Sequence, residues 1–214
     1  SNSTAISISG GLEPLTNPML GNIISYAKEK NIRVPLITNG YSLTKNYLIK
    51  NPGLWNLDSL RLSLYGVDHE TYYYITRLKN SFKLVYRNTI DFLKERNKIN
   101  PKLKFGFNFI VVDENVDQLE RVIDLIEEIN KKVDNGPGIN FLTLRDDFES
   151  VTGKNYDHGR IYKLKGGLSD QRKKLIDTLF NIEKKKLIQC PDLHIDYGYA
   201  LYPYSKGFSG DQLF

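Results

Sequence analysis

Cysteine is almost absent from the 214-residue chain, which contains only Cys190. One thiol cannot form an internal disulfide, nor can it build the multi-cysteine metal site of a zinc or iron–sulfur protein. The composition therefore fits a reducing compartment, and we expect a cytoplasmic protein. Long apolar runs are also missing: no stretch approaches the roughly 20 residues of a membrane span, and the first residues do not resemble a signal peptide.

Histidine is also scarce, and the chain has no long cluster of charges of one sign. The three histidines, His69, His158 and His194, are too dispersed for their spacing to indicate a metal site. His194, two residues before Asp196, is a candidate proton donor, but we favour a surface histidine without a catalytic role. Lys and Arg number 30 against 25 Asp and Glu, and the net charge of +5 is scattered along the chain. Without a nucleic-acid-reading motif, this pattern favours a solvated basic surface over a nucleic-acid partner.

Short apolar runs alternate with longer amphipathic stretches, which predicts a single domain over residues 1–214. Residues 1–3 resemble the remnant of an expression tag, and residues 190–214 form an aromatic loop extension. We expect strands at residues 4–9, 33–38, 59–64, 104–112, 139–145 and 193–196, and helices after Asn17-Pro18, at about residues 42–49, 82–96 and 116–130, and after Ser169. This order predicts an α/β fold with a parallel sheet, either doubly wound or a partial (β/α) TIM-like barrel.

Small, polar or singly charged residues follow the predicted strands, at the edge where both folds bind ligands. Glycines let a ligand approach the backbone, a lone carboxylate suits an ammonium group, and Ser, Thr and Asn offer neutral donors and acceptors. These types together fit a zwitterionic, hydroxylated ligand. The set consists of Gly10, Gly11, Glu13, Thr38, Asn39, Gly40, Ser63, Tyr65, Asn108 and Arg145.

Each of these features also has a purely structural interpretation. Gly10-Gly11 can form a tight turn, and Asn39-Gly40 has the composition of a common turn. Arg145 can form a surface ion pair with the acids that follow it, which has little effect on stability. Their shared location at strand ends nevertheless favours a binding site.

Three strand-end motifs occur in a fixed order: SGGLEP at residues 9–14, ITNG at 37–40 and LRLSLYG at 60–66. In this order they resemble the radical S-adenosylmethionine superfamily. Its members carry a Gly-Gly-Glu motif on the second strand, a Thr-Asn-Gly-type turn on the third and a Ser-containing strand on the fourth. The resemblance covers nearly the whole chain and implies a partial barrel whose first strand is absent, with one departure, the extra Leu12 between the glycines and the acid.

The resemblance also implies roles for individual residues in binding S-adenosyl-L-methionine. The glycines and the acid would hold the methionine amino group, and the Thr-Asn pair would lie near the methionine or the ribose. The serine would bond the carboxylate or ribose. Asn108, Ile110 and Val111 would flank the ribose and adenine, and Leu144 and Arg145 would lie beside the adenine or substrate. The implied cofactor-binding residues are Gly10, Gly11, Glu13, Thr38, Asn39, Ser63, Asn108, Val111 and Arg145.

The superfamily further implies a 4Fe-4S cluster, held by a Cys-x3-Cys-x2-Cys loop, and an electron donor such as ferredoxin or flavodoxin. This sequence contains no such loop, and Cys190 cannot replace three thiolates, so we expect the chain alone to be inactive. Two explanations stay open: truncation, with the ligands upstream, or a relative that has lost the cluster. We favour truncation, because a barrel without its first strand exposes an unpaired sheet edge.

Two functions are consistent with the sequence. The first is the S-adenosylmethionine-binding portion of a radical iron–sulfur enzyme that generates a 5′-deoxyadenosyl radical for hydrogen abstraction from a small-molecule or peptide substrate. The alternative is a cluster-less α/β module that binds a ligand or a partner protein. We also expect the tyrosines of residues 72–74 to cover the sheet edge from a helix, and the aromatic tail to line a substrate pocket.

Overall fold

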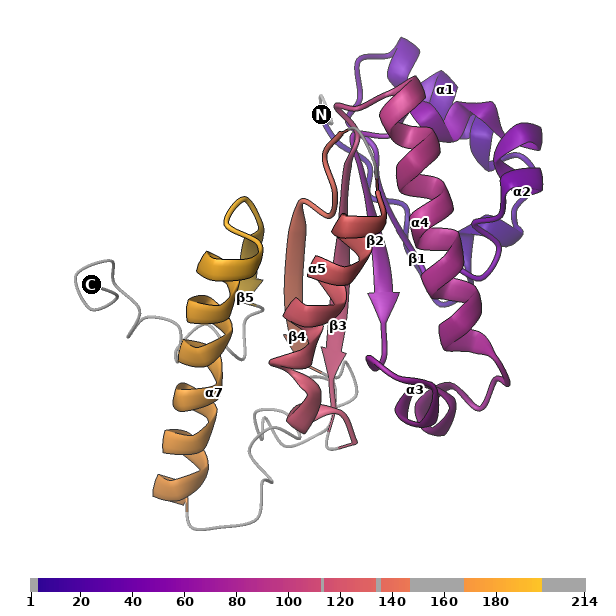
Figure 1. Ribbon diagram of the computed structural model, residues 1–214. Coiled ribbons are helices and arrows are strands. Elements are labelled where there is room, and N and C mark those ends of the chain that lie inside the picture. Colours follow the sequence, from indigo (N-terminus) through magenta and orange to yellow (C-terminus); the bar gives the residue numbers. More distant parts are fainter. Residues whose placement is uncertain (1–3, 113, 134–135, 147–167, 198–214) are drawn as a thin grey trace.

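Five parallel strands form one sheet in the order β1-β2-β3-β4-β5 (Figure 1). The computed structural model describes residues 4–112, 114–133, 136–146 and 168–197. The strands are β1 (Pro35–Thr38), β2 (Ser59–Leu64), β3 (Lys104–Val111), β4 (Phe141–Asp146) and β5 (His194–Tyr197). The predicted α/β fold with a parallel sheet is confirmed, and among the described residues the sheet remains open rather than closing into a barrel.

The segment expected as a strand at residues 4–9 lies along the free edge of β1. It makes two isolated parallel bridges, from Ala5 to Arg33 and from Ile8 to Leu36. The backbone N–H of Ile8 donates to Pro35 O at 2.9 Å, and the N–H of Ile37 donates to Ile8 O at 2.9 Å. Because the pairing is parallel, the glycines that follow this segment lie at the same sheet edge as the residues that follow β1.

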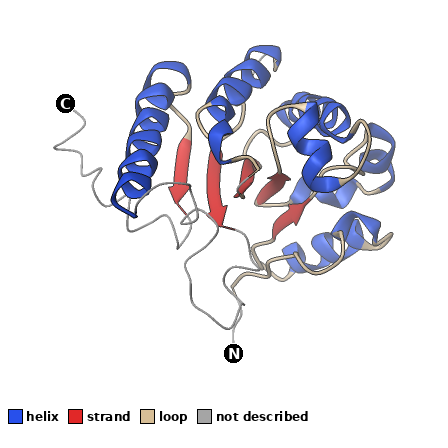
Figure 2. Ribbon diagram, turned by 90° about the horizontal axis from the view of Figure 1, so that it is seen from below, coloured by secondary structure: helices blue, strands red, loops and turns tan. Residues whose placement is uncertain are grey.

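Helices lie along the outer side of the curved row of strands (Figure 2). The α-helices are α1 (Leu20–Glu29), α2 (Lys45–Lys50), α3 (His69–Thr76), α4 (Ser81–Ile99), α5 (Arg121–Lys132) and α7 (Leu168–Gln189), and the 3-10 helices are η1 (Pro14–Thr16), η2 (Pro52–Asn56) and η3 (Val116–Gln118). No helix in the described part of the chain is both long and apolar enough to cross a membrane. The predictions for residues 1–3 and for residues 198–214 of the aromatic extension lie outside the described residues.

Helix boundaries differ from the sequence predictions at several points. The helix expected at residue 18 begins at Leu20, because the Asn17 side chain accepts a hydrogen bond from the Met19 N–H and forms a turn. The helix expected at 116–130 is divided into η3 and α5. The tyrosines of residues 72–74 do lie in a helix, α3, but only Tyr72 is buried, while Tyr73 and Tyr74 are 39% and 51% exposed.

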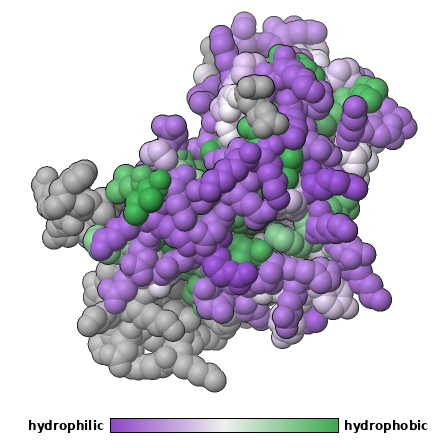
Figure 3. Space-filling model, in the orientation of Figure 1, coloured by the Kyte–Doolittle hydropathy of each residue, from purple (hydrophilic) through white to green (hydrophobic). Residues whose placement is uncertain are grey.

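Alternate residues of the strands point to opposite faces of the sheet, and the two faces differ in chemistry. In β2, Leu60, Leu62 and Leu64 belong to the hydrophobic core, whereas Arg61 and Ser63 lie between them in sequence. The core face packs against the helices; for example, the ring centroids of Phe105 in β3 and Phe92 in α4 are 5.5 Å apart. The opposite, inner face therefore carries the polar strand residues. Figure 3 shows that the outside of the molecule in this view is mainly hydrophilic, with small apolar patches.

Arg96 is a fully buried arginine near the end of α4. Its guanidinium donates to the carbonyl oxygens of Leu103, Pro137 and Gly138 and to the side chain of Asn140. Burial lowers the pKa of this group to about 10, so it stays charged at neutral pH. A buried charge needs such acceptors. Arg96 thus joins the segments that precede β3 and β4 at the amino edge of the sheet.

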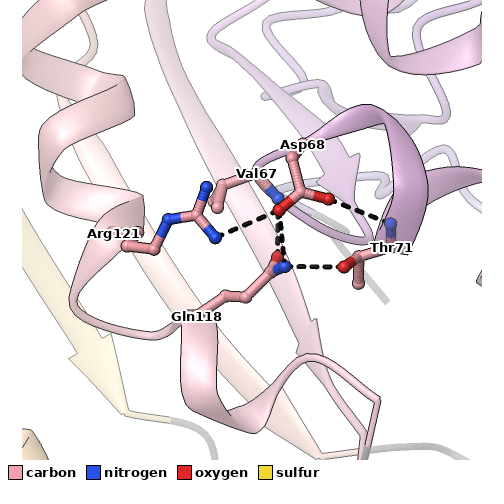
Figure 4. A network of polar contacts seen from close by, with 5 residues as sticks. All are labelled: Val67, Asp68, Thr71, Gln118 and Arg121. Carbon is pink, nitrogen blue, oxygen red and sulfur yellow. Dashed lines mark hydrogen bonds and ion pairs between the residues drawn. The ribbon is translucent and has the colours of Figure 1, made fainter.

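A polar network at the carboxyl edge fixes the loop that follows β2 (Figure 4). Asp68 caps α3 by accepting from the Thr71 N–H at 2.9 Å, and it also accepts from Gln118 at 2.9 Å and Arg121 at 3.0 Å. The Gln118 side chain, which is buried, accepts from the Val67 N–H at 2.9 Å. These bonds tie the loop after β2 to η3 and α5, and they explain why the predicted helix breaks after Gln118.

We predict that this network makes stability depend on pH. Partial burial opposes ionisation of Asp68, but the hydrogen bonds from Thr71 and the charge of Arg121 outweigh it and lower the pKa of the carboxyl below its ordinary value. A lowered folded-state pKa gives stability that is present above the unfolded pKa and is lost as pH falls through the folded pKa. Asp68→Asn should cost about 1 kcal/mol of unfolding free energy at pH 7, and less as pH falls below about 4.

Urea unfolding of the wild type and the variant at a series of pH values measures this difference. The exposed Asp177 of α7 supplies the matched control, because Asp177→Asn removes a carboxylate without disturbing a described network. An Asp68→Asn penalty that stays constant down to pH 3 would contradict the role of Asp68 ionisation.

Candidate functional site

Glu13 joins the first two strand-end motifs. Its Oε1 accepts hydrogen bonds from the Leu15 N–H at 3.1 Å, which caps η1, and from the Thr38 hydroxyl at 2.5 Å. Its Oε2 accepts from the Asn39 N–H at 2.8 Å. A carboxylate has about four lone-pair sites, so these three bonds leave acceptor capacity on Oε2 for a ligand. The acid after the glycines is therefore held in one position before any ligand arrives.

The Thr-Asn-Gly turn after β1 is held by its own side chains and by α4. The Thr38 hydroxyl accepts from the Gly40 N–H at 3.1 Å, and the Asn39 side chain accepts from the Tyr41 N–H at 3.0 Å. Asn88 of α4 donates to Gly40 O at 3.0 Å. Gly40 has φ of +78°, and an added Cβ would lie 2.6 Å from the Leu62 side chain. Only glycine suits this position, so the turn serves packing as well as the site.

A cavity of about 700 Å³ lies at this carboxyl edge. Apart from the adjacent residues in the chain, no atom of the described residues lies within 4 Å of where a Cβ would stand on Gly10 or Gly11, so a ligand can approach this backbone. Tyr65 also lines the cavity; burial, with a contribution from the charge of Glu13, raises the pKa of its phenol, which stays neutral at physiological pH. The predicted residues that line the cavity are Gly10, Gly11, Glu13, Thr38, Asn39, Ser63 and Arg145.

Two predicted cofactor-binding residues are not among those lining the cavity. Asn108 lies opposite Ser63 in the register of β2 and β3, but its side chain is 3% exposed and its Oδ1 has no hydrogen-bond partner among the described residues. Val111 is fully buried in the hydrophobic core and lies on the same face of β3 as Phe107 and Phe109. The alternation of strand side chains places Val111 on the helix-covered face.

The cavity combines the charges and polar groups that a zwitterion needs. Glu13 supplies a negative charge on one side, and Arg145, which is exposed at the end of β4, supplies a positive charge. Ser63 and Tyr65 add neutral hydroxyls from the end of β2. The arrangement can bind an ammonium group, a carboxylate and hydroxyl groups at one place.

The described residues contain no group of three His, Cys, Asp or Glu side chains that could hold a metal ion. Cys190 is buried and lies before β5, at the sheet edge opposite the cavity. Burial raises the pKa of its thiol to about 11. Because the thiolate is the form that binds iron, Cys190 is a poor ligand as well as a distant one.

Cys190 should consequently be almost unreactive in the folded chain. At pH 8 we expect Ellman's reagent to modify it at least about 100-fold more slowly than a free thiol, because the thiol is both protonated and buried. The same chain in guanidinium chloride is the control and should release one equivalent of chromophore. Rapid reaction without denaturant would contradict the burial of Cys190.

The chain is similar to a curated enzyme along nearly its whole length. The chain is 35% identical over 214 residues to dTDP-4-amino-4,6-dideoxy-D-glucose ammonia-lyase of Streptomyces venezuelae, a match that covers 99% of the chain and 41% of the relative. The chain thus spans about two fifths of the length of this curated relative. No protein-family model matches the chain.

Two solved structures share the fold. A domain of pyruvate-formate lyase-activating enzyme from Bacteroides vulgatus aligns with a TM-score of 0.56 and 12% identity, covering 90% of this chain and 98% of that one. SuiB of Streptococcus suis aligns with a TM-score of 0.58 and 17% identity, covering 94% of this chain and 41% of that one. At these identities the structures support the fold and not the substrate.

Proposed function

We propose that the chain belongs to the radical S-adenosylmethionine superfamily and is the S-adenosyl-L-methionine-binding portion of a radical enzyme; the order of its strand-end motifs and its fold support this proposal. The observation that supports this most directly is Glu13, held between two motif loops at the rim of a cavity lined by bare glycine backbone. The methionine ammonium would bind the Glu13 carboxylate. Thr38 and Asn39 would position that carboxylate, and Ser63 would bind the methionine carboxylate or the ribose.

The donor set of the cavity suits S-adenosyl-L-methionine but not an iron–sulfur cluster. The cofactor offers an ammonium, a carboxylate and a ribose diol, and the lining residues provide a carboxylate, an arginine and hydroxyls. A 4Fe-4S cluster needs thiolates, and the chain's one cysteine is buried at the opposite edge. We therefore propose that the cluster ligands of the whole protein come from sequence beyond these 214 residues.

In the whole protein, bound S-adenosyl-L-methionine would supply the 5′-deoxyadenosyl radical that abstracts a hydrogen atom from the substrate, given a cluster and an electron donor such as ferredoxin or flavodoxin. The role of this chain's residues would be to hold the cofactor and to exclude water around it. The buried faces of β2 and β3 provide a rigid support for that task.

For the substrate of the whole protein we propose a sugar nucleotide that carries an amino group, and for the reaction the loss of ammonia. The support is the 35% identity, along nearly all of this chain, to a dTDP-4-amino-4,6-dideoxy-D-glucose ammonia-lyase. The fold neighbours do not bear on this choice, since a shared fold does not imply a shared substrate.

Replacing Glu13 tests the cofactor site. In the full-length protein, Glu13→Gln should weaken S-adenosyl-L-methionine binding by about 10- to 100-fold, because a charge-assisted hydrogen bond is replaced by a neutral amide. Isothermal titration calorimetry measures the affinity, and circular dichroism verifies that the variant is folded. Glu29→Gln, at an exposed position of α1, is the matched control and should leave the affinity unchanged. Unchanged affinity in folded Glu13→Gln would remove the proposed ammonium site.

The iron content of the full-length protein separates an enzyme from a cluster-less binding module. After anaerobic reconstitution we expect about four iron atoms per chain and conversion of S-adenosyl-L-methionine to 5′-deoxyadenosine in the presence of a reductant. A full-length protein with no Cys-x3-Cys-x2-Cys segment and no bound iron would instead support the binding module.

A further inference from the structure

A second cavity of about 480 Å³ lies on the inner face of the same sheet. It is separate from the candidate cofactor site, and its lining residues come from β2 to β5 and the segments just before them. Of these residues, only His194 and Asp196 stand out in the sequence as candidates for a chemical role. The charged, aromatic and hydroxyl residues in its lining are Arg61, Lys104, Phe141, Thr143, Asp192, His194 and Asp196.

The two cavities are neighbours along two strands. In β2, Ser63 lines the cofactor cavity and Arg61 lines the second cavity. In β4, Arg145 lines the cofactor cavity and Thr143 lines the second cavity. Each pair is two residues apart on one strand face, which corresponds to about 6.6 Å along the strand. A ligand in the second cavity would therefore lie directly beside a ligand in the first.

Thr143 contributes a buried hydroxyl to the wall of the second cavity. It is 3% exposed and lines the cavity, and its hydroxyl has no hydrogen-bond partner among the described residues. Asn108, directly opposite Thr143 in the register of β3 and β4, has a buried Oδ1 in the same situation. Buried polar atoms without partners cost free energy, so two of them in one row require an explanation.

Two opposite charges lie near Asn108 and Thr143: the Arg61 guanidinium on β2 and the Asp196 carboxylate on β5. The Arg61 guanidinium stacks over the Phe141 ring at 5.4 Å from its centroid, and the Asp196 carboxylate is close enough to act on Arg61 electrostatically. Asp196 is also the direct neighbour of Thr143 in the register of β4 and β5. The cavity thus offers an anion-binding group, a hydroxyl and a cation-binding group across the sheet.

We propose that the second cavity binds the substrate, an amino-sugar phosphate unit of a sugar nucleotide, beside the cofactor. This inference rests on the proposed function and assigns residues to it: Asp196 binds the sugar ammonium, Thr143 binds a sugar hydroxyl, and Arg61 binds a phosphate oxygen. The three side chains belong to β2, β4 and β5, so the ligand spans the inner face of the sheet.

Two ligands that differ in one group test the assignment in the full-length protein. dTDP-4-amino-4,6-dideoxy-D-glucose carries the ammonium, and dTDP-6-deoxy-D-glucose has a hydroxyl in its place. Asp196→Asn should weaken binding of the amino ligand at least about tenfold and change binding of the hydroxyl ligand less than about threefold, because only the amino ligand is charged there. Arg61→Gln and Thr143→Val should weaken both ligands, by about tenfold and about threefold, because both contain phosphate and ring hydroxyls.

Calorimetric titrations with each ligand and with S-adenosyl-L-methionine keep the two sites distinguishable. Arg87→Gln on α4 and Asp177→Asn on α7 remove equivalent charges from exposed positions and should change no affinity. All three site variants should keep wild-type affinity for S-adenosyl-L-methionine.

Equal losses for the two sugar ligands in Asp196→Asn, or no loss in any of the three variants, would overturn the assignment while the cofactor site stands. Wild-type protein that binds S-adenosyl-L-methionine but neither sugar nucleotide would overturn both the assignment and the proposed substrate class. Wild-type protein that binds sugar nucleotides but not S-adenosyl-L-methionine would overturn the proposed cofactor site alone.

Discussion

Helices cover one face of the parallel sheet in the described structure, and the arrangement of both cavities follows from this constraint. A parallel sheet commonly buries both faces and reads as continuous apolar runs. Here β2 alternates, with Leu60 and Leu62 in the core and Arg61 and Ser63 on the inner face. The burial of the leucines thereby fixes the direction of the polar side chains. Binding groups on neighbouring strands are brought to one surface without depending on long loops.

One carboxylate serves both the fold and the candidate site at the carboxyl edge. Glu13 caps η1 through the Leu15 N–H and receives bonds from Thr38 and Asn39. Because these bonds connect the segment before β1 with the turn after it, the glycine backbone and the Thr-Asn-Gly turn keep a fixed separation. The network of Asp68 and Gln118 holds the loop after β2 in place in the same manner. Tyr65, which lines the cavity, is the first residue of this loop. The rim of the cavity is thus rigid on two of its sides.

Much of the fold could be predicted from sequence because alternation and turn residues are local signals. The strand at residues 59–64 was predicted with the observed bounds, and its polar positions also indicate the inner face. Helix ends were less predictable, since the break after η3 depends on Gln118 bonding to residues near 67–71. The placement of Val111 in the core follows from strand alternation. The second cavity was missed, although Arg61 and Thr143 stand at alternating positions of their strands.

The order of the strand-end motifs, the alternation of apolar and polar strand residues and the lack of thiolates for a cluster can all be read from the chain before it folds. The meeting of Glu13 with Thr38, and of Thr143 with Asn108 and Asp196, depends on the folded sheet. Periodicity is a property of neighbouring residues and does not specify such contacts. Contacts between strands depend on register and sheet curvature, which the packing of helices from the whole chain sets.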